Sequence, residues 1–525
     1  MIQLILLVVL SYLLCYYVLK PYTFWKERGI QYVQPVPIFG NVFRNIIQQK
    51  SLAEIVKSIY DKLKHQRYSG MYQFMKPVLL INDIDLIKKI TIKDFDHFTD
   101  HVNHAREDVD RLWSKNLFAM TGSTWRDMRG TLSPAFTASK MRFMFSLINE
   151  CAENLASHYL KKNEELIEIE MRDTYTRVSN DVIASCAFGI KCDSLNDPNN
   201  VFYVRASKAF DYSGIRQSVF ILYHSVPKLM KFLGWKIFDD EMGTFFRGVI
   251  DESIKIREDK GIVRPDMLNL LMEAKNGKLS GESNKNSVDS FASTNEYSLG
   301  KKITNIELTN ENITAQCLIF FNAGFDTTSY AMCFLTYELA LNGEIQDKLR
   351  EEIITTWKKC EGNVTYQDLI GMTYLDMVIS EVLRKWPPVP YIERLCTKDY
   401  TIVATRPDEK DYKVKKNDFV YIPVFGIHRD SKYYPNPEKF DPERFAVENR
   451  EKMYPSTYLP FGSGPRNCIG SRLAILETKV TIFHLLRNFQ VLPTKKTSIP
   501  MVISRKQFTV SSQHDFWLGL KRLSS

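Results

Sequence analysis

The sequence predicts a mainly α-helical fold: a single large domain with small β-sheets, preceded by an N-terminal transmembrane helix. Helical periodicity dominates residues 51–270, as in 145–161, and one largely apolar stretch without proline covers residues 309–341. Short β-like segments occur only late, at residues 400–405 and 419–423. No internal repeat or second composition regime divides the 525 residues, so we expect one large domain.

The first segment of the chain predicts a membrane anchor at residues 1–19. Residues 2–19 carry no charged side chain, and at about 1.5 Å per residue a helix of this length roughly spans a bilayer core. Lys20, Lys26 and Arg28 follow at once, which places the remainder on the cytosolic side. The alternative is a cleaved signal peptide, but the basic n-region and an A-x-A-like site are missing.

The rest of the chain divides into a basic, proline-containing linker at residues 20–40 and a globular domain at 41–525. Pro35 and Pro37 make the linker stiff and extended. Residues 276–300 are rich in Ser, Asn and Gly, which predicts a mobile surface loop within the domain.

Composition narrows the classes of partner. The formal net charge is +9, from 70 basic and 61 acidic residues that are dispersed along the chain. This pattern argues against nucleic acid as a partner and favours an acidic protein or anionic lipid. The nine cysteines are scattered without a short paired spacing, so neither a disulfide framework nor a zinc site is indicated, and we expect a reducing compartment.

The most informative segment is the loop that contains Phe461, Gly464, Arg466, Cys468 and Gly470. An apolar, helix-like run follows it, so the cysteine lies near a helix N-terminus, where the dipole favours a thiolate. The two glycines leave room for a flat macrocycle to approach the backbone, and the arginine is placed to bind a haem propionate. The alternative interpretation is a buried structural cysteine.

This loop resembles the haem-binding signature of the cytochrome P-450 family, FxxGxRxCxG, at all five fixed positions. The resemblance implies a P-450-type helical domain, a haem b cofactor, and Cys468 as the axial ligand of the haem iron. It covers essentially the whole chain. It is closest to the microsomal, xenobiotic-metabolising branch and its insect members, on segments such as 24–29 and 441–445.

Other segments agree with this resemblance in order and spacing. Glu381 and Arg384 match the family's ExxR helix, and Arg444 completes the ion-pair network, which implies a role in folding and not in chemistry. The resemblance also implies contacts with the haem propionates, at positions that match family motifs: Trp125, Arg129, Arg394 and His428.

The long apolar stretch carries the pattern of the family's oxygen-activation motif. Ala323 and Thr327 share a helix face that Phe320 and Gln316 continue, and Asp326 is positioned to relay protons from solvent. Gly324 permits a local widening at which the Thr327 hydroxyl leaves the backbone ladder. The alternatives are a kinked helix with a satisfied Asp, or a second membrane span, which the polar residues of the stretch argue against.

These features imply a haem-thiolate monooxygenase that inserts one oxygen atom from O2 into hydrophobic small molecules, which include plant toxins, insecticides and endogenous lipids or hormones. The resemblance implies an NADPH-dependent flavoprotein reductase as electron donor, with cytochrome b5 as a second candidate partner and Lys439 as a candidate docking residue. It also implies the endoplasmic reticulum membrane, with the catalytic domain on the cytosolic face. The alternatives are a haem-thiolate isomerase or dehydratase, and a non-catalytic haem or hydrophobic-ligand binder.

Two further sets of residues carry weaker expectations. A histidine trio has zinc-like spacing but is more typical of a solvated surface: His97, His101 and His104. The candidate pocket-lining residues, for which ordinary core packing is the alternative, are Phe118, Phe210, Phe220, Phe320, Phe325, Val389 and Val502.

Overall fold

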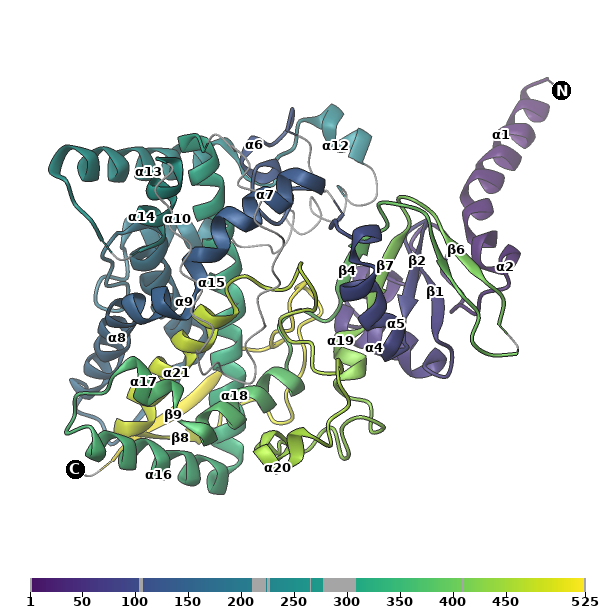
Figure 1. Ribbon diagram of the computed structural model, residues 1–525. Helices are drawn as coiled ribbons and strands as arrows, with labels where there is room; N and C mark the ends of the chain where they lie inside the picture. The colour runs from purple at the N-terminus through teal and green to yellow at the C-terminus, as the bar shows by residue number, and fades with distance from the viewer. Residues whose placement is uncertain are drawn as a thin grey trace.

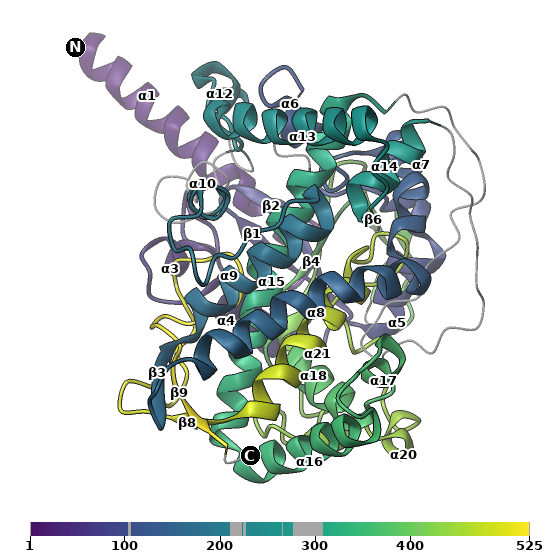
Figure 2. The same ribbon diagram turned by 90° about the vertical axis from the view of Figure 1, so that its left-hand side faces the viewer.

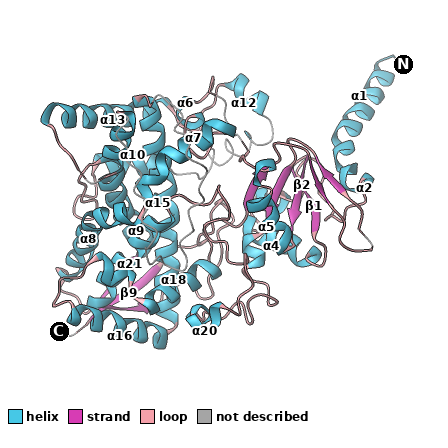
Figure 3. Cartoon of the chain, viewed as in Figure 1, coloured by secondary structure: helices cyan, strands magenta, loops and turns pink. Residues whose placement is uncertain are grey.

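The computed structural model describes residues 2–102, 107–209, 223, 227–264, 266–276, 308–407 and 409–523. A large helical part and a smaller sheet-rich part lie side by side (Figure 1). Most of the strands belong to the smaller part, as Figure 3 shows. The prediction of a mainly helical chain with small sheets is confirmed. His104, Phe210, Phe220 and all but the first residue of the predicted loop at 276–300 lie outside the described residues.

The helices of the described residues are α1 (Ile2–Leu19), α2 (Phe24–Glu27), α3 (Phe43–Ile46), α4 (Leu52–Leu63), α5 (Ile84–Lys88), α6 (Arg111–Ser114), α7 (Gly122–Leu132), α8 (Ala138–Leu160), α9 (Met171–Ile183), α10 (Val201–Ala209), α12 (Pro227–Leu233), α13 (Asp240–Lys260), α14 (Met267–Lys275), α15 (Asn310–Leu341), α16 (Gly343–Lys359), α17 (Tyr366–Ile370), α18 (Thr373–Lys385), α19 (Val424–Ile427), α20 (Val447–Arg450) and α21 (Ser471–Asn488).

The strands form three small sheets. The largest has the order β1 (Tyr68–Gln73), β2 (Lys76–Ile81), β7 (Phe419–Ile422), β4 (Ile392–Leu395). A three-stranded sheet has the order β3 (Leu166–Glu170), β9 (Trp517–Arg522), β8 (Phe489–Pro493), and β5 (Tyr400–Ile402) pairs with β6 (Tyr412–Val414). β4 lies at the edge of its sheet, where it pairs with β7, and Leu395 on its other side bridges to Asp100.

The N-terminal apolar segment is a helix, as predicted, and it projects away from the rest of the molecule (Figure 2). Among the described residues, no helix is both long and apolar enough to cross a membrane. The prediction that this helix spans the bilayer is therefore not supported.

The segment predicted as a linker packs onto the sheet-rich part. Trp25 of α2 is buried, and its indole nitrogen donates to the carbonyl of Met71 at 3.0 Å. A Cβ at Gly70 would lie 2.5 Å from the same indole ring. The chain therefore enters its folded body at Trp25, soon after α1 ends.

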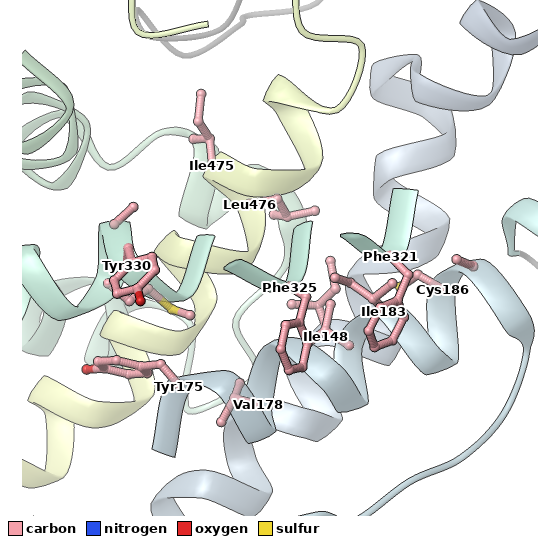
Figure 4. Packing of buried hydrophobic residues seen from close by; sticks show 14 of the residues in the cluster. Ile148, Tyr175, Val178, Ile183, Cys186, Phe321, Phe325, Tyr330, Ile475 and Leu476 are labelled. Atoms are coloured by element: carbon pink, nitrogen blue, oxygen red, sulfur yellow. The ribbon is translucent and has the colours of Figure 1, made fainter. Parts of the chain in front are cut away.

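Helix α15 forms the centre of the helical core. It begins after Thr309, whose hydroxyl accepts the Asn312 N–H at 3.2 Å, and it confirms the predicted long helix. Figure 4 shows Phe321 and Phe325 of α15 beside Ile183 of α9. Both phenylalanines are buried and stack on one another, with ring centroids 5.3 Å apart.

Gly324 allows α15 and α9 to approach closely. A Cβ at this position would lie 2.6 Å from the Cδ1 atom of Ile183. Since such a contact is sterically forbidden, a larger residue at position 324 requires the Ile183 side chain to change rotamer or one of the two helices to move. This close approach lies in the motif that includes Ala323 and Thr327, so it also determines where that motif sits.

We predict that Gly324→Ala lowers the free energy of unfolding of the haem-loaded protein by roughly 1–3 kcal/mol, the usual effect of overpacking a core. Ile183→Val removes the Cδ1 atom, so the same glycine substitution should be less destabilising in an Ile183→Val background. Urea unfolding of the four proteins measures both effects. Equal destabilisation in both backgrounds would contradict the steric explanation.

Candidate active site

The loop before α21 is closed by its own backbone. The Cys468 N–H donates to the Phe461 carbonyl at 2.8 Å, and the Asn467 N–H donates to the Gly464 carbonyl at 2.9 Å. Gly462 and Gly464 have φ angles of 79° and 76°, which side-chain-bearing residues rarely adopt. The loop therefore presents the cysteine side chain in a defined position.

One of the two signature glycines, Gly464, has a different role from the one we expected, whereas Gly470 borders the cavity with open space around it. A Cβ at Gly464 would lie 1.7 Å from the backbone oxygen of Thr91, so this glycine permits contact with the segment after α5. At Gly470 the backbone φ is −87°, and a Cβ would come no closer than 4.0 Å to the Phe136 ring. We expected both glycines to leave room for a macrocycle. At Gly464 this space is filled by the Thr91 backbone of the protein itself.

The side chain of Cys468 lies deep in the protein, and its accessible surface opens into a cavity of 960 Å³. From α15 the cavity is lined by Phe320, Ala323, Gly324, Phe325, Asp326 and Thr327, and from the cysteine loop by Phe461, Gly462, Arg466 and Gly470. Phe118 and Val389 also line it, as predicted, whereas Val502 borders a separate cavity of 390 Å³. The cavity therefore joins the two segments that the sequence singled out.

The surroundings of Cys468 do not by themselves favour a thiolate. Burial raises the pKa of the thiol, against the opposing effects of the Gly470 N–H and the Arg129 guanidinium. The helix N-terminus that we expected to favour the thiolate is therefore outweighed by burial. A metal cation that binds a cysteine sulfur removes its proton. The site therefore fits a cysteine that ionises when it binds a metal.

Two buried arginines flank the cysteine loop and line the cavity. Arg394 on β4 donates to the Ser463 carbonyl at 3.2 Å, and among the described residues its Nε atom has no hydrogen-bond partner. Burial lowers the pKa of Arg394 to about 10. Arg466 donates to the carbonyls of Thr99 and Met120 at 2.7 and 2.6 Å, and burial lowers its pKa as well. Arg466 also has a charged partner, Asp100, at 3.6 Å. Within the described part of the chain, Arg394 has an unsatisfied buried donor, which a carboxylate on a group bound in the cavity would stabilise, so this residue fits a haem with its propionates.

Trp125 and Arg129, which we expected to contact the propionates, instead contact residues of the cysteine loop. The indole of Trp125 lies against the Arg466 guanidinium, at 4.0 Å from ring centroid to Cζ. Arg129 donates to the backbone and side-chain oxygens of Asn467, at 3.0 and 2.8 Å. Neither residue borders the cavity. Their geometry is that of positioning residues for Arg466 and the cysteine loop, and not of direct propionate contacts.

His428 does not make the propionate contact that we expected. Its Nδ1 atom lies 3.1 Å from the Arg384 carbonyl, and its Nε2 atom accepts the Leu459 N–H at 2.8 Å. Burial lowers the pKa of the imidazole to about 3, so the ring is neutral. Since both nitrogens serve backbone groups, His428 connects α18 to the segment that leads into the cysteine loop.

The ExxR residues form a fully buried ion pair. The Arg384 guanidinium donates to both carboxylate oxygens of Glu381, at 2.7 and 2.8 Å, and to the His428 carbonyl at 2.8 Å. The Arg444 Nε atom lies 3.4 Å from Glu381, whose carboxylate also accepts the Asp441 N–H at 2.9 Å. The predicted association of the three charged side chains is confirmed.

The charged residue of the α15 motif has a partner that the sequence did not reveal. Asp326 forms an ion pair with Arg172 of α9, and Arg172 also donates to Ser329. The guanidinium lies 3.8 Å from the ring centroid of Tyr330. No local pattern marks Arg172, because its role depends on how α9 packs against α15.

Thr327 and Gln316 differ from the expected arrangement. The Thr327 hydroxyl donates to the Ala323 carbonyl at 2.5 Å, so it remains bonded to the helix backbone. Gln316 is buried and bonds to the backbone that follows α6. Its side chain donates to the Lys115 carbonyl at 2.7 Å and accepts the Leu117 N–H at 2.9 Å. Gln316 therefore does not continue the cavity face of α15.

The histidines with zinc-like spacing lie in different environments. The Nδ1 atom of His97 lies 3.1 Å from the Asp399 carbonyl, whereas His101 borders the cavity. In the part of the chain that the structure describes, no group of three or more His, Cys, Asp or Glu side chains is placed to hold a metal ion.

Comparison with known proteins decides the family. The family model described as cytochrome P450 matches residues 31–518. The chain belongs to the cytochrome P450 family. It is 43% identical over 513 residues to cytochrome P450 9e2 of Blattella germanica, covering 95% of this chain and 93% of that protein. It is 41% identical to the protein named probable cytochrome P450 9f2 of Drosophila melanogaster (95% and 94% covered) and 39% identical to cytochrome P450 6k1 of Blattella germanica (96% and 94% covered).

Cytochromes P450 are haem-thiolate monooxygenases that bind haem b through a cysteine thiolate, and this chain is one of them. Cys468 occupies the cysteine position of the family's haem signature. The unpaired Nε atom of Arg394 and the cavity beside the cysteine agree with this cofactor.

For this cytochrome P450 we predict that Glu381→Gln lowers the free energy of unfolding by about 3–5 kcal/mol, because Arg384 is left as an uncompensated buried charge. Haem incorporation during expression should fall sharply. The control is Lys57→Gln, which breaks a surface ion pair of 2.6 Å with Asp61 and should change stability by about 0–1 kcal/mol. Similar urea midpoints for the two variants would contradict a central role for the buried pair.

Proposed function

We propose that this cytochrome P450 oxidises hydrophobic small molecules of foreign origin, such as plant toxins and insecticides, with endogenous lipids or hormones as the second substrate class. The observation that carries the proposal is the shared cavity, in which Cys468, the α15 motif and aromatic side chains such as Phe118 and Phe320 meet. Aromatic and aliphatic walls bind apolar ligands by removing them from water.

In this proposal Cys468 ligates the haem iron, and Arg394 and Arg466 hold the propionates. When bound, the haem supplies the reduction and cleavage of dioxygen, which a thiolate ligand promotes. Trp125 keeps the Arg466 guanidinium in place, and Arg129 holds Asn467, so the cysteine keeps its position beneath the cavity. Phe461 accepts the Cys468 N–H and closes the loop.

Asp326 and Thr327 are the proposed proton-handling residues. The Asp326 carboxylate, paired with Arg172, is partly accessible, with 20% of its side chain exposed. It can therefore receive a proton from solvent only as its bond to the guanidinium loosens. The Thr327 hydroxyl is a donor and also has acceptor capacity, so it can turn from the Ala323 carbonyl toward a group in the cavity.

The presence of this acid and alcohol pair favours monooxygenation over the two alternatives. A haem-thiolate isomerase or dehydratase, and a non-catalytic haem or ligand binder, have no need for protons delivered at this point. Electrons are proposed to come from NADPH through a membrane-bound flavoprotein reductase, with cytochrome b5 as a second donor. Lys439, with 70% of its side chain exposed, is a candidate contact for either acidic partner.

We also propose that α1 holds the enzyme on the endoplasmic reticulum membrane, with the catalytic domain on the cytosolic face. Apolar side chains such as Leu4 and Ile5 are 69% and 57% exposed, and Tyr17 near the other end is 71% exposed. A helix with this surface gains free energy when it inserts into lipid. Lys20 and Lys26 follow it, which favours the cytosolic orientation.

The function is tested by comparing Cys468→Ala and Thr327→Ala with the wild type. Cys468→Ala should lose the strongly red-shifted Soret band of the reduced protein with carbon monoxide. Thr327→Ala should keep that band and its substrate-induced spectral shifts, because the loss of one hydroxyl contact is worth only about 1 kcal/mol. Its ratio of product to NADPH consumed should fall, since assistance by a positioned acid is worth roughly 10²–10⁴-fold. More hydrogen peroxide should appear in exchange.

Thr336→Ala is the matched control, because Thr336 is buried on the same helix, bonds to the carbonyl four residues earlier as Thr327 does, and does not border the cavity. It should leave the product-to-NADPH ratio near the wild-type value. A Thr327→Ala variant with wild-type coupling would contradict the proton-handling role, and thiolate-type absorption from Cys468→Ala would contradict the ligand assignment.

For the membrane proposal, we predict that deletion of residues 2–19 strongly reduces flotation with lipid vesicles and leaves a haem-loaded protein. The rest of the chain should stay folded, because the body begins with the buried Trp25. Vesicle flotation and the carbon monoxide difference spectrum measure the two outcomes. Unchanged flotation would show that α1 is not the anchor, and complete loss of haem would show that α1 is part of the fold.

A further inference from the structure

The short edge strand β4 directs two neighbouring charged residues to different places. Successive side chains of a strand point to opposite faces. Arg394 extends to the cysteine loop, where it donates to the Ser463 carbonyl. Glu393 extends to the segment that contains His101 and Val102, where its carboxylate accepts the Val102 N–H. Both Glu393 and Arg394 line the cavity beside Cys468.

The Glu393 carboxylate lies next to an aromatic wall. Its Oε1 atom is 3.9 Å from the Nδ1 atom of His101. The His101 ring in turn stacks on Phe118, with centroids 4.5 Å apart and planes at 18°. His101 and Phe118 also border the cavity, so a ligand that packs against this wall comes close to the carboxylate.

Glu393 is distinguished from the other acids of the cavity by its position, because it lies beside the His101–Phe118 wall and next to Arg394. The other acids that border the cavity are Glu170, Asp173, Asp326, Glu477 and Asp515. Glu477 accepts a hydrogen bond from the Ser179 hydroxyl at 2.6 Å and is almost fully buried, at 1% exposure. The Glu393 side chain keeps 12% of its surface accessible. A carboxylate has about four acceptor sites, so it can take a ligand in addition to its backbone bond.

We propose that Glu393 is a specificity-determining residue that selects hydrophobic substrates carrying a cationic nitrogen, with the His101–Phe118 wall holding the apolar part of the same molecule. This inference rests on the proposed function and names a substrate class for its cavity. A cationic nitrogen beside the carboxylate gains Coulomb energy in surroundings of low dielectric, and the wall adds apolar and cation–π contact. An uncharged substrate of the same shape gains only the apolar contact with the wall.

The titration of Glu393 is consistent with this role. Burial raises the pKa of its carboxyl to about 7, against the opposing effects of the Val102 N–H and the Arg394 guanidinium. A bound cation favours the ionised form, so binding near neutral pH should release protons. Besides Arg394, the titratable groups that face this carboxyl are His101, Tyr391 before β4, and Tyr421 of β7.

The test uses the full-length haem-loaded enzyme and two probes. One is 4-phenylbutyl-trimethylammonium, whose nitrogen is always charged and has no lone pair for the iron. The other is its uncharged analogue with tert-butyl in place of trimethylammonium. Affinities come from ligand-induced spectral shifts. In the wild type the cation should bind more tightly than the neutral probe, and Glu393→Gln should weaken the cation roughly tenfold while changing the neutral probe less than about twofold.

Glu393→Gln is chosen because its amide oxygen can still accept the Val102 N–H, so the loop contact is kept. Glu165→Gln is the control: Glu165 is an acid whose side chain is 85% exposed, and its loss removes the same charge from the chain. It should leave both affinities unchanged. An equal ratio of the two affinities in the wild type and Glu393→Gln would overturn the proposal.

A pH series on the wild type keeps the proposal testable even if Glu393→Gln does not retain haem. Because the cationic probe does not titrate, its affinity should rise between pH 6 and pH 8 as Glu393 ionises, while the neutral probe should show little change. A flat profile for the cation would contradict the proposal.

The outcome is separable from the proposed function. If the neutral probe is oxidised with NADPH and reductase by both the wild type and Glu393→Gln, monooxygenation of hydrophobic molecules stands, whatever the charge preference. If neither probe is oxidised by the wild type although its thiolate spectrum is intact, the substrate class of the proposed function fails first.

Discussion

The buried ion pair between Glu381 and Arg384 is the constraint on which the site depends. Its two charges are removed from water, so each is tolerable only while the other is held in place. From this pair a series of hydrogen bonds leads to the start of the cysteine loop. Arg384 donates to the His428 carbonyl, the His428 ring accepts the Leu459 N–H, and the Gly462 N–H returns to the Leu459 carbonyl. A disturbance in α18 is therefore expected to reach the cysteine loop.

A second constraint is steric and comes from the helical core. α15 carries its functional motif close to α9 at a point where Gly324 brings no side chain to the Ile183 contact. The same approach brings Arg172 to Asp326, which converts a lone carboxylate into an ion pair at the cavity edge. Packing and electrostatics are thus coupled here, since the distance between the two helices determines both.

The charges around the cavity indicate what it holds. Arg394 and Arg466 are cations whose pKa values burial lowers, and Glu393 is a carboxyl whose pKa burial raises. Such groups are stabilised by partners of opposite charge. For the arginines the haem propionates are suitable partners, and for the carboxyl a cationic substrate is suitable. The thiol of Cys468 follows the same rule, because burial opposes its ionisation until a metal binds it.

Much of this protein could be read from the sequence because its signals are local. The FxxGxRxCxG loop, the ExxR turn and the long proline-free stretch depend on residues a few positions apart, where backbone geometry relates spacing directly to position. The predicted mainly helical fold, the helix that became α15 and the association of Glu381, Arg384 and Arg444 follow from such signals.

Only the tertiary structure decided which distant side chains meet. The partnership of Asp326 with Arg172 spans 154 positions, and that of His428 with Arg384 spans 44, so no local period encodes either one. For the same reason we expected Gly464 to lie beside a cofactor, although it lies against the Thr91 backbone. We also expected His428 to lie beside a propionate, although both ring nitrogens bond to backbone groups. The sequence alone determined which residue types could perform the chemistry. Folding determined which of them share a cavity, because desolvation and close contact depend on packing between segments that are far apart in the chain.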